Sequence, residues 1–88
     1  MPWAIKLNPL SAKTLKQLDK PEKQRMEAFI DDLATTNNPR TKGKALQGDL
    51  KGLWSYRVGN YRLIAQIKDS ELVILVIELG HRKNVYKK

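Results

Sequence analysis

Alternation of apolar and polar side chains predicts a short strand near the start of the chain. In residues 3–7, apolar side chains recur at every second position, the period of a half-buried strand. Asn8 and Pro9 then form a typical helix start, because Asn is a good N-cap and Pro fits the first helical position. The helix that follows would place four residues on one face: Leu10, Thr14, Leu15 and Leu18.

A second helix has the clearest helical period in the sequence. Pro21 suits its first turn, and Glu22 there complements the helix dipole. Its apolar side chains follow the spacing i, i+3, i+4 and i+7, and these are Met26, Phe29, Ile30 and Leu33. Polar residues with a proline end the helix at residues 35–39. Two consecutive helices with a tight turn between them predict an antiparallel helical hairpin.

Strand patterns return after residues 35–52, which we interpret as a polar, basic loop. Residues 53–58 and 61–68 predict two strands that the two-residue turn of Gly59 and Asn60 joins into a hairpin. After a second turn at residues 69–71, residues 72–79 form a nearly continuous apolar strand, which indicates a central position in a sheet.

The order strand, two helices and three strands predicts an α+β fold. We expect a single domain over residues 1–88, in which the N-terminal strand and the helical hairpin pack on one face of a small antiparallel β-sheet. The other face of the sheet should be at least partly open.

Composition narrows the class of protein. The 88 residues include no cysteine, which excludes disulfide scaffolds, thiolate zinc sites and cysteine nucleophiles. No signal peptide is expected, because Lys6 and Asn8 interrupt the only apolar stretch near the start. The longest apolar run, residues 72–77, is far too short to cross a membrane. We therefore expect a cytoplasmic protein with no membrane partner.

Positive charge is concentrated in the middle of the chain. The net charge is +8, and residues 35–68 carry seven Lys and Arg side chains with Asp49 as the single acidic residue. Such segregation favours a polyanionic partner, although solubility alone is the alternative explanation.

The predicted hairpin places two arginines directly opposite each other. A two-residue turn pairs Arg57 with Arg62 on the face away from the apolar side chains. Like charges in such a pair are unfavourable, and at a separation of about 5 Å they repel by roughly 3 kcal/mol at an effective dielectric of 20. An anion between them, phosphate in particular, would remove the conflict. The alternative is that a three-residue turn after residue 68 places Glu78 opposite Arg62.

A second group of candidates follows the last strand. Within residues 80–86 lie an imidazole, two cations and a phenol, the groups of His81, Arg82, Lys83 and Tyr86. Such groups suit phosphodiester chemistry, although a solvated basic terminus is the alternative. One histidine, no cysteine and no acidic cluster argue against a metal site, and no dinucleotide or phosphate-loop motif indicates a cofactor. An enzyme of this kind would need a substrate with its own nucleophile, as RNA has in its 2′-hydroxyl.

Residues 46–64 and 79–86 closely resemble the RelE/ParE toxin superfamily, and the helical hairpin and the length match it as well. The resemblance implies the toxin of a type II toxin–antitoxin pair. RelE-like members cleave mRNA in the ribosomal A site without a metal, by attack of the 2′-hydroxyl on the adjacent phosphate. A cognate RelB-like antitoxin neutralises the toxin, and the complex of the two binds operator DNA.

The resemblance also assigns roles by position. It implies that Arg62 stabilises the transition state, that Arg82 contacts the phosphate or protonates the leaving group, and that Tyr86 stacks on or orients a nucleotide. Arg57 is the nearest equivalent of two strand lysines, but arginine is a poor base, so the general base stays open with His81 as a candidate. The predicted RNA contacts are Lys42, Lys44, Lys51 and Lys83.

Two other functions remain open. ParE-like relatives inhibit DNA gyrase and lack the set of cations and tyrosine, so the presence of Arg62, Arg82 and Tyr86 favours the nuclease. The chain could also be a plain nucleic-acid-binding module that serves only in operon repression.

Overall fold

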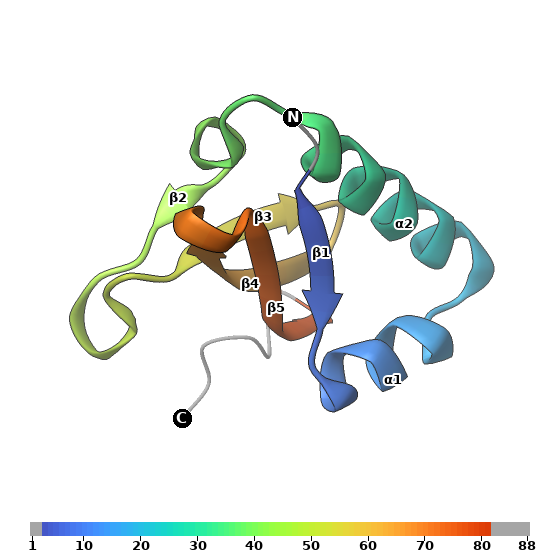
Figure 1. Cartoon of the computed structure of the whole chain (residues 1–88). Helices are drawn as coiled ribbons and strands as arrows, with labels where there is room; N and C mark the ends of the chain where they lie inside the picture. Colours follow the sequence, from blue (N-terminus) through green and yellow to red (C-terminus); the bar gives the residue numbers. More distant parts are fainter. Residues whose placement is uncertain (1–2, 82–88) are drawn as a thin grey trace.

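A five-stranded sheet forms the centre of the computed structural model, which describes residues 3–81 (Figure 1). Its strands are β1 (Ala4–Leu7), β2 (Lys44–Ala45), β3 (Trp54–Val58), β4 (Tyr61–Lys68) and β5 (Val73–His81). The helices are α1 (Pro9–Gln17) and α2 (Lys20–Thr35), and three short 3-10 turns are η1 (Pro39–Lys42), η2 (Gly48–Leu50) and η3 (Asp69–Glu71). The expected α+β architecture is therefore confirmed.

The strands lie in the order β1-β5-β4-β3-β2, with the long apolar strand β5 inside the sheet as predicted. Strands β2 to β5 pair in antiparallel fashion, whereas β1 runs parallel to β5, so the sheet is mixed rather than wholly antiparallel. Asn8 fixes the end of β1, because its backbone N–H donates to Val76 and its side-chain amide donates to the carbonyl oxygen of Ile77.

Both helices begin where the sequence predicts. The side chain of Asn8 accepts a hydrogen bond of 2.9 Å from the backbone N–H of Ser11, and Pro9 opens α1. On α2, Met26 and Leu33 are buried, and Phe29 and Ile30 pack partly buried against the same core. Only two residues separate α1 from α2, and the chain reverses direction between them (Figure 1).

Leu10 departs from the prediction that it joins the apolar face of α1. Its side chain is 69% exposed, whereas Leu15 and Leu18 pack against the core. The buried residue in the first turn of α1 is instead Ser11.

The face of the β3–β4 hairpin under the helices is apolar as predicted. Its side chains belong to the core or pack against it: Trp54, Tyr56, Val58, Tyr61, Leu63, Ala65 and Ile67. Gly59 has a φ of 60°, and Asn60 is not left-handed, which are the features of a type II′ turn. This turn fixes the hairpin register.

Residues 35–52 contain more structure than the loop that the sequence predicts. The two residues of β2 pair with β3, Lys44 opposite Ser55 and Ala45 opposite Trp54. We call residues 39–45, which comprise η1, Gly43 and β2, the η1–β2 segment. An exposed strand of two residues shows no periodicity, which is why the pattern does not reveal it.

Three side-chain contacts hold the η1–β2 segment against the rest of the fold. The buried hydroxyl of Tyr56 donates to the carbonyl oxygen of Pro39 at 2.9 Å. Arg40 donates two hydrogen bonds to Asp69, at 2.6 and 3.1 Å, and its guanidinium lies 5.8 Å from the ring centre of Trp54. The third contact is an ion pair between Lys42 and Asp32 of α2, with 3.0 Å between Nζ and the carboxylate oxygen.

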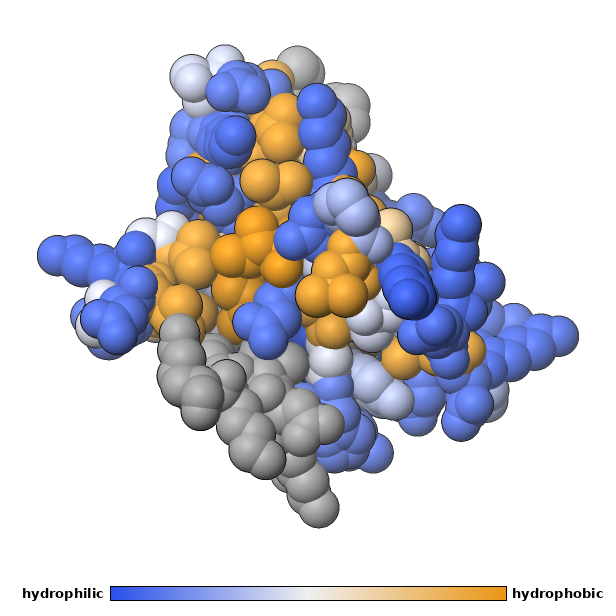
Figure 2. Space-filling model, turned by 90° about the horizontal axis from the view of Figure 1, so that it is seen from below, coloured by the Kyte–Doolittle hydropathy of each residue, from blue (hydrophilic) through white to orange (hydrophobic). Residues whose placement is uncertain are grey.

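None of the helices within residues 3–81 has the length and apolar character needed to cross a membrane. Seen from below, the surface shows hydrophobic side chains gathered near its middle, with hydrophilic ones around them (Figure 2).

Removing the hydroxyl of Tyr56 should destabilise the fold. Burial raises the pKa of Tyr56 to about 12, and the nearby Arg40 opposes this only in part, so the hydroxyl stays a donor. In Tyr56→Phe the carbonyl of Pro39 loses its donor, and we expect the free energy of unfolding to fall by about 1–2 kcal/mol in urea denaturation. Tyr61→Phe is the control, because that hydroxyl makes no hydrogen bond within the described chain. Equal stability of the two variants would contradict the role of the contact.

The contact between Arg40 and Asp69 should make the stability of the fold depend on pH. The hydrogen bonds from Arg40 lower the pKa of Asp69 in the folded state, whereas the unfolded carboxyl titrates near about 3.9. The stabilisation is therefore fully present above the unfolded pKa and is lost as the pH falls through the lower pKa of the folded state. We expect Asp69→Asn to have a lower melting temperature than the wild type at about pH 7, and the difference to shrink as the pH falls through that range. Asp49→Asn should match the wild type throughout.

Candidate functional site

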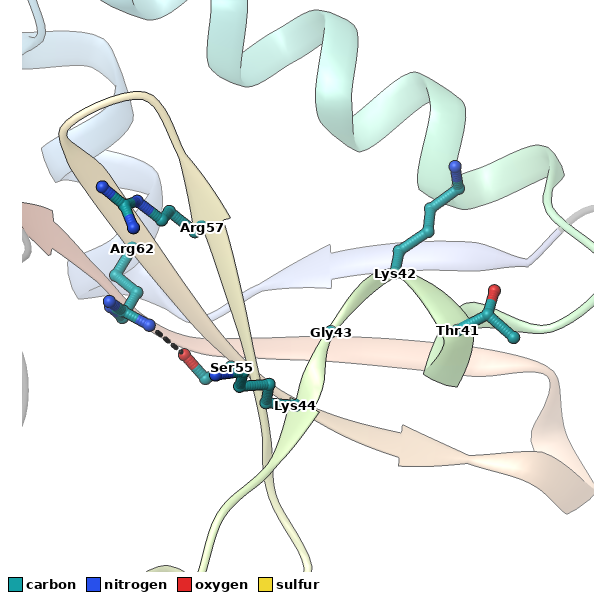
Figure 3. A pocket seen from close by; sticks show the side chains of 7 residues that line it. All are labelled: Thr41, Lys42, Gly43, Lys44, Ser55, Arg57 and Arg62. Atoms are coloured by element: carbon teal, nitrogen blue, oxygen red, sulfur yellow. Dashed lines mark hydrogen bonds between the residues drawn. The ribbon is translucent and has the colours of Figure 1, made fainter.

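A basic pocket lies on the face of the sheet away from the helices (Figure 3). Its volume is about 350 Å³. The η1–β2 segment forms one side, and the β3–β4 hairpin forms the other. The lining residues are Thr41, Lys42, Gly43, Lys44, Ser55, Arg57 and Arg62. Every charged residue among them is a cation, so the electrostatic field of the pocket attracts anions.

Arg57 and Arg62 lie directly opposite each other on β3 and β4, as the turn length predicts. Both guanidinium groups extend to the same side of the hairpin (Figure 3). The alternative that Glu78 lies opposite Arg62 is wrong, because Gly80 occupies that position and Glu78 pairs with Ile64. Four residues rather than three separate β4 from β5, and the register also shifts between Ile64 and Ala65.

Ser55 supports the guanidinium of Arg62 from the floor of the pocket. Its side chain is buried, and its Oγ accepts a hydrogen bond of 3.2 Å from Nη1 of Arg62. Since Ser55 belongs to a strand fixed on both sides by pairing, this bond gives the guanidinium a rigid neighbour.

Gly43 brings the η1–β2 segment close to the hairpin. A Cβ atom at this position would lie 2.7 Å from the carbonyl oxygen of Ser55 and 2.8 Å from the ring of Tyr56. Only glycine allows this approach, and it places Lys42 and Lys44 at the edge of the pocket.

The two lysines of the η1–β2 segment behave differently. Lys44 extends from β2 toward Ser55 and Arg62 (Figure 3). Lys42 points toward α2, where its Nζ lies 3.0 Å from a carboxylate oxygen of Asp32. The side chain of Lys44 thus extends toward Arg62, whereas the ammonium of Lys42 is engaged by Asp32.

Two further predicted residues, Lys51 and His81, are described by the structure and lie outside the pocket. Lys51 follows η2 and does not line it. His81 pairs with Tyr61, and their rings meet edge-on at 5.5 Å on the helix side of the sheet, opposite to Arg62. The candidate positions Arg82, Lys83 and Tyr86 lie outside the described residues.

The chemistry of the lining is that of an anion site. Two guanidinium forks and an ammonium can bind and neutralise a phosphate. The hydroxyl of Thr41 already donates to the carbonyl oxygen of Asn38 at 2.9 Å. Among the described residues, the lining offers no carboxylate or imidazole that could accept a proton near neutral pH. Within residues 3–81, no cluster of three or more His, Cys, Asp or Glu could hold a metal ion.

Sequence reasoning missed three lining residues: Thr41, Gly43 and Ser55. Strand alternation places Ser55 on the same face as Arg57, so the pattern contains a signal for it. Nothing in the pattern indicates Thr41 or Gly43, because the pairing of β2 with β3 is a tertiary contact.

Comparison with known proteins finds toxins of similar sequence. A model of the ParE toxin family of type II toxin–antitoxin systems, parDE, matches residues 5–86. Toxin RelG of Mycobacterium tuberculosis is 26% identical over the full length of both chains.

Solved structures show the same fold. A chain of the toxin–antitoxin complex RelBE2 of Mycobacterium tuberculosis has a TM-score of 0.83 at 26% identity, with 93% of each chain covered. A chain of the archaeal RelE–RelB complex of Pyrococcus horikoshii has a TM-score of 0.73 at 30% identity, covering 93% of this chain and 97% of the other. With its α+β fold and basic pocket, the chain thus belongs to the ParE toxin family of type II toxin–antitoxin systems and is a RelE-like member of the RelE/ParE superfamily.

Proposed function

We propose that this toxin is a ribosome-dependent endoribonuclease that cleaves mRNA in the A site and so inhibits translation in the cytoplasm. The observation that supports this most directly is the facing pair of Arg57 and Arg62 in a pocket whose charged lining is entirely basic. A protein that needed only a soluble surface would have no reason to place these charges together.

In the proposed reaction, one phosphorus–oxygen bond forms and another breaks. The 2′-hydroxyl of one nucleotide attacks the adjacent phosphorus, and the bond to the 5′-oxygen of the next nucleotide breaks. The products are a 2′,3′-cyclic phosphate and a free 5′-hydroxyl. Negative charge builds up on the phosphorane oxygens in between, and the arginine pair with Lys44 would stabilise it there. Ser55 would hold Arg62 in place as this charge develops.

Proton transfer must involve groups outside the described lining. His81 faces the helix side of the sheet and is poorly placed for the role of general base. Arg82 and Tyr86 remain predictions for leaving-group protonation and for orienting a nucleotide, and Lys51 and Lys83 remain predictions for contact with RNA. The proposed reaction needs no metal or cofactor, because the substrate supplies the nucleophile.

We also propose a RelB-like antitoxin as the partner that neutralises the toxin. The structural relatives were solved as RelBE2 and RelE–RelB complexes, and this supports an equivalent complex here. Binding of operator DNA would then be a property of the complex rather than of the toxin alone.

Inhibition of DNA gyrase is the second candidate function, and the description of the family as ParE toxin favours it. Mutation of Arg62 distinguishes the two, because an inhibitor that does not touch a phosphate does not need this side chain.

Arg62→Ala should abolish toxicity through loss of cleavage. Removal of one preorganised donor typically lowers kcat by about 10²–10³-fold, which is enough to relieve growth arrest. The measurement is growth after induced expression, together with mapping of 5′ ends in ribosome-bound mRNA. Lys13→Ala removes the same charge from the exposed surface of α1 and should stay toxic.

Two outcomes would contradict the nuclease. Translation arrest with intact mRNA would exclude cleavage as the cause. A DNA-damage response that persists in Arg62→Ala would instead support inhibition of gyrase.

Arg57→Gln should stabilise the fold while it weakens activity. The variant removes the like-charge pair. Solvent screens these side chains, so the gain should be on the order of 1 kcal/mol, below the roughly 3 kcal/mol of two fixed unit charges about 5 Å apart. We expect urea denaturation to show a higher free energy of unfolding, with a larger difference at low salt than at high salt. Lys51→Gln changes the same charge outside the pocket and serves as the control. A destabilised Arg57→Gln would show that the facing pair is not under electrostatic strain.

A further inference from the structure

We propose that Asp32 holds Lys42 away from the basic pocket and that a phosphate of the RNA competes with Asp32 for this ammonium group. The proposal rests on the proposed function, since it concerns how the same pocket binds RNA. It makes Asp32 a positioning residue, which tunes the affinity of the site without touching the substrate.

Lys42 contributes to the pocket lining, but its charged end lies elsewhere. Its Nζ is 3.0 Å from Oδ2 of Asp32 on α2. Figure 3 shows the side chain directed toward that helix, away from Arg57 and Arg62. A lysine has a flexible four-carbon stem, so its ammonium can swing between a partner on the helix and one at the pocket.

The ion pair is exposed enough to be replaced. The side chains of Lys42 and Asp32 are 34% and 63% exposed. Solvent-exposed pairs of this kind are weak, because water and salt screen them. Arg40 is held differently, since two hydrogen bonds join it to Asp69.

Charge in the pocket decides which partner Lys42 prefers. Lys44, Arg57 and Arg62 already gather there, so a fourth cation would be repelled from the empty pocket. A bound phosphate reverses the sign of this interaction and offers an acceptor for the ammonium. Asp32 therefore competes with the substrate for Lys42, and its removal should make the lysine fully available.

The test is a set of binding measurements with a fluorescein-labelled single-stranded RNA whose 2′-O-methyl groups prevent cleavage. We expect Asp32→Asn to lower the Kd by about two- to fivefold, the factor that a surface ion pair can supply. Its salt dependence should become steeper, by up to about 0.7 in the slope of log K against log salt, as expected for one added contact with a single strand.

Matched variants separate this effect from a general change of charge. Asp31→Asn removes the same charge from the neighbouring position of α2, where the carboxylate makes no ion pair within the described chain. Lys42→Gln should weaken binding only slightly in the wild type but cancel the whole gain in the Asp32→Asn background. Melting temperatures of the variants verify that each is folded.

Each outcome is decisive. Equal affinities of Asp32→Asn and Asp31→Asn, weaker binding by Asp32→Asn, or a gain that survives Lys42→Gln would overturn the role of Asp32. Arg62→Gln tests the pocket separately: unchanged RNA binding in that variant would contradict the proposed function instead.

Discussion

The two-residue turn of Gly59 and Asn60 is the constraint on which the site depends. It pairs Arg57 with Arg62 and simultaneously sends Tyr56, Val58 and Leu63 to the opposite face. Burial of that apolar face stabilises the same hairpin that the facing charges destabilise, and burial is the larger effect. The sheet thus holds the two arginines at facing positions because its other face packs against α2.

The second side of the pocket depends on contacts between segments far apart in the chain. Glycine at position 43 lets the backbone of the η1–β2 segment lie against β3. The hydroxyl of Tyr56 holds the segment through its hydrogen bond to Pro39. Arg40 links the η1–β2 segment to Asp69 of η3, which follows the β3–β4 hairpin in the chain. These contacts make the pocket a property of the whole fold rather than of one motif.

Residue patterns predict the helices, the β3–β4 hairpin and the facing arginines, because caps, periodicity and a two-residue turn are local signals. The pattern leaves the partner of Glu78 open, because it depends on Leu72, which takes a left-handed conformation that no local rule assigns to leucine, and on the register shift near Ile64. His81 follows Gly80 in sequence but lies on the opposite face. The pairing of β5 with β4 shows that Gly80, and not His81, lies opposite Arg62.

The link between Arg40 and Asp69 also bears on when the pocket forms during synthesis. The two residues are separated by 29 positions, and the strands that carry both arginines lie between them. A nascent chain that has reached the end of β3 therefore contains Lys42 and Lys44 but lacks both Arg62 and the carboxylate that secures Arg40. The anion site of the toxin is therefore complete only when most of the chain has been synthesised.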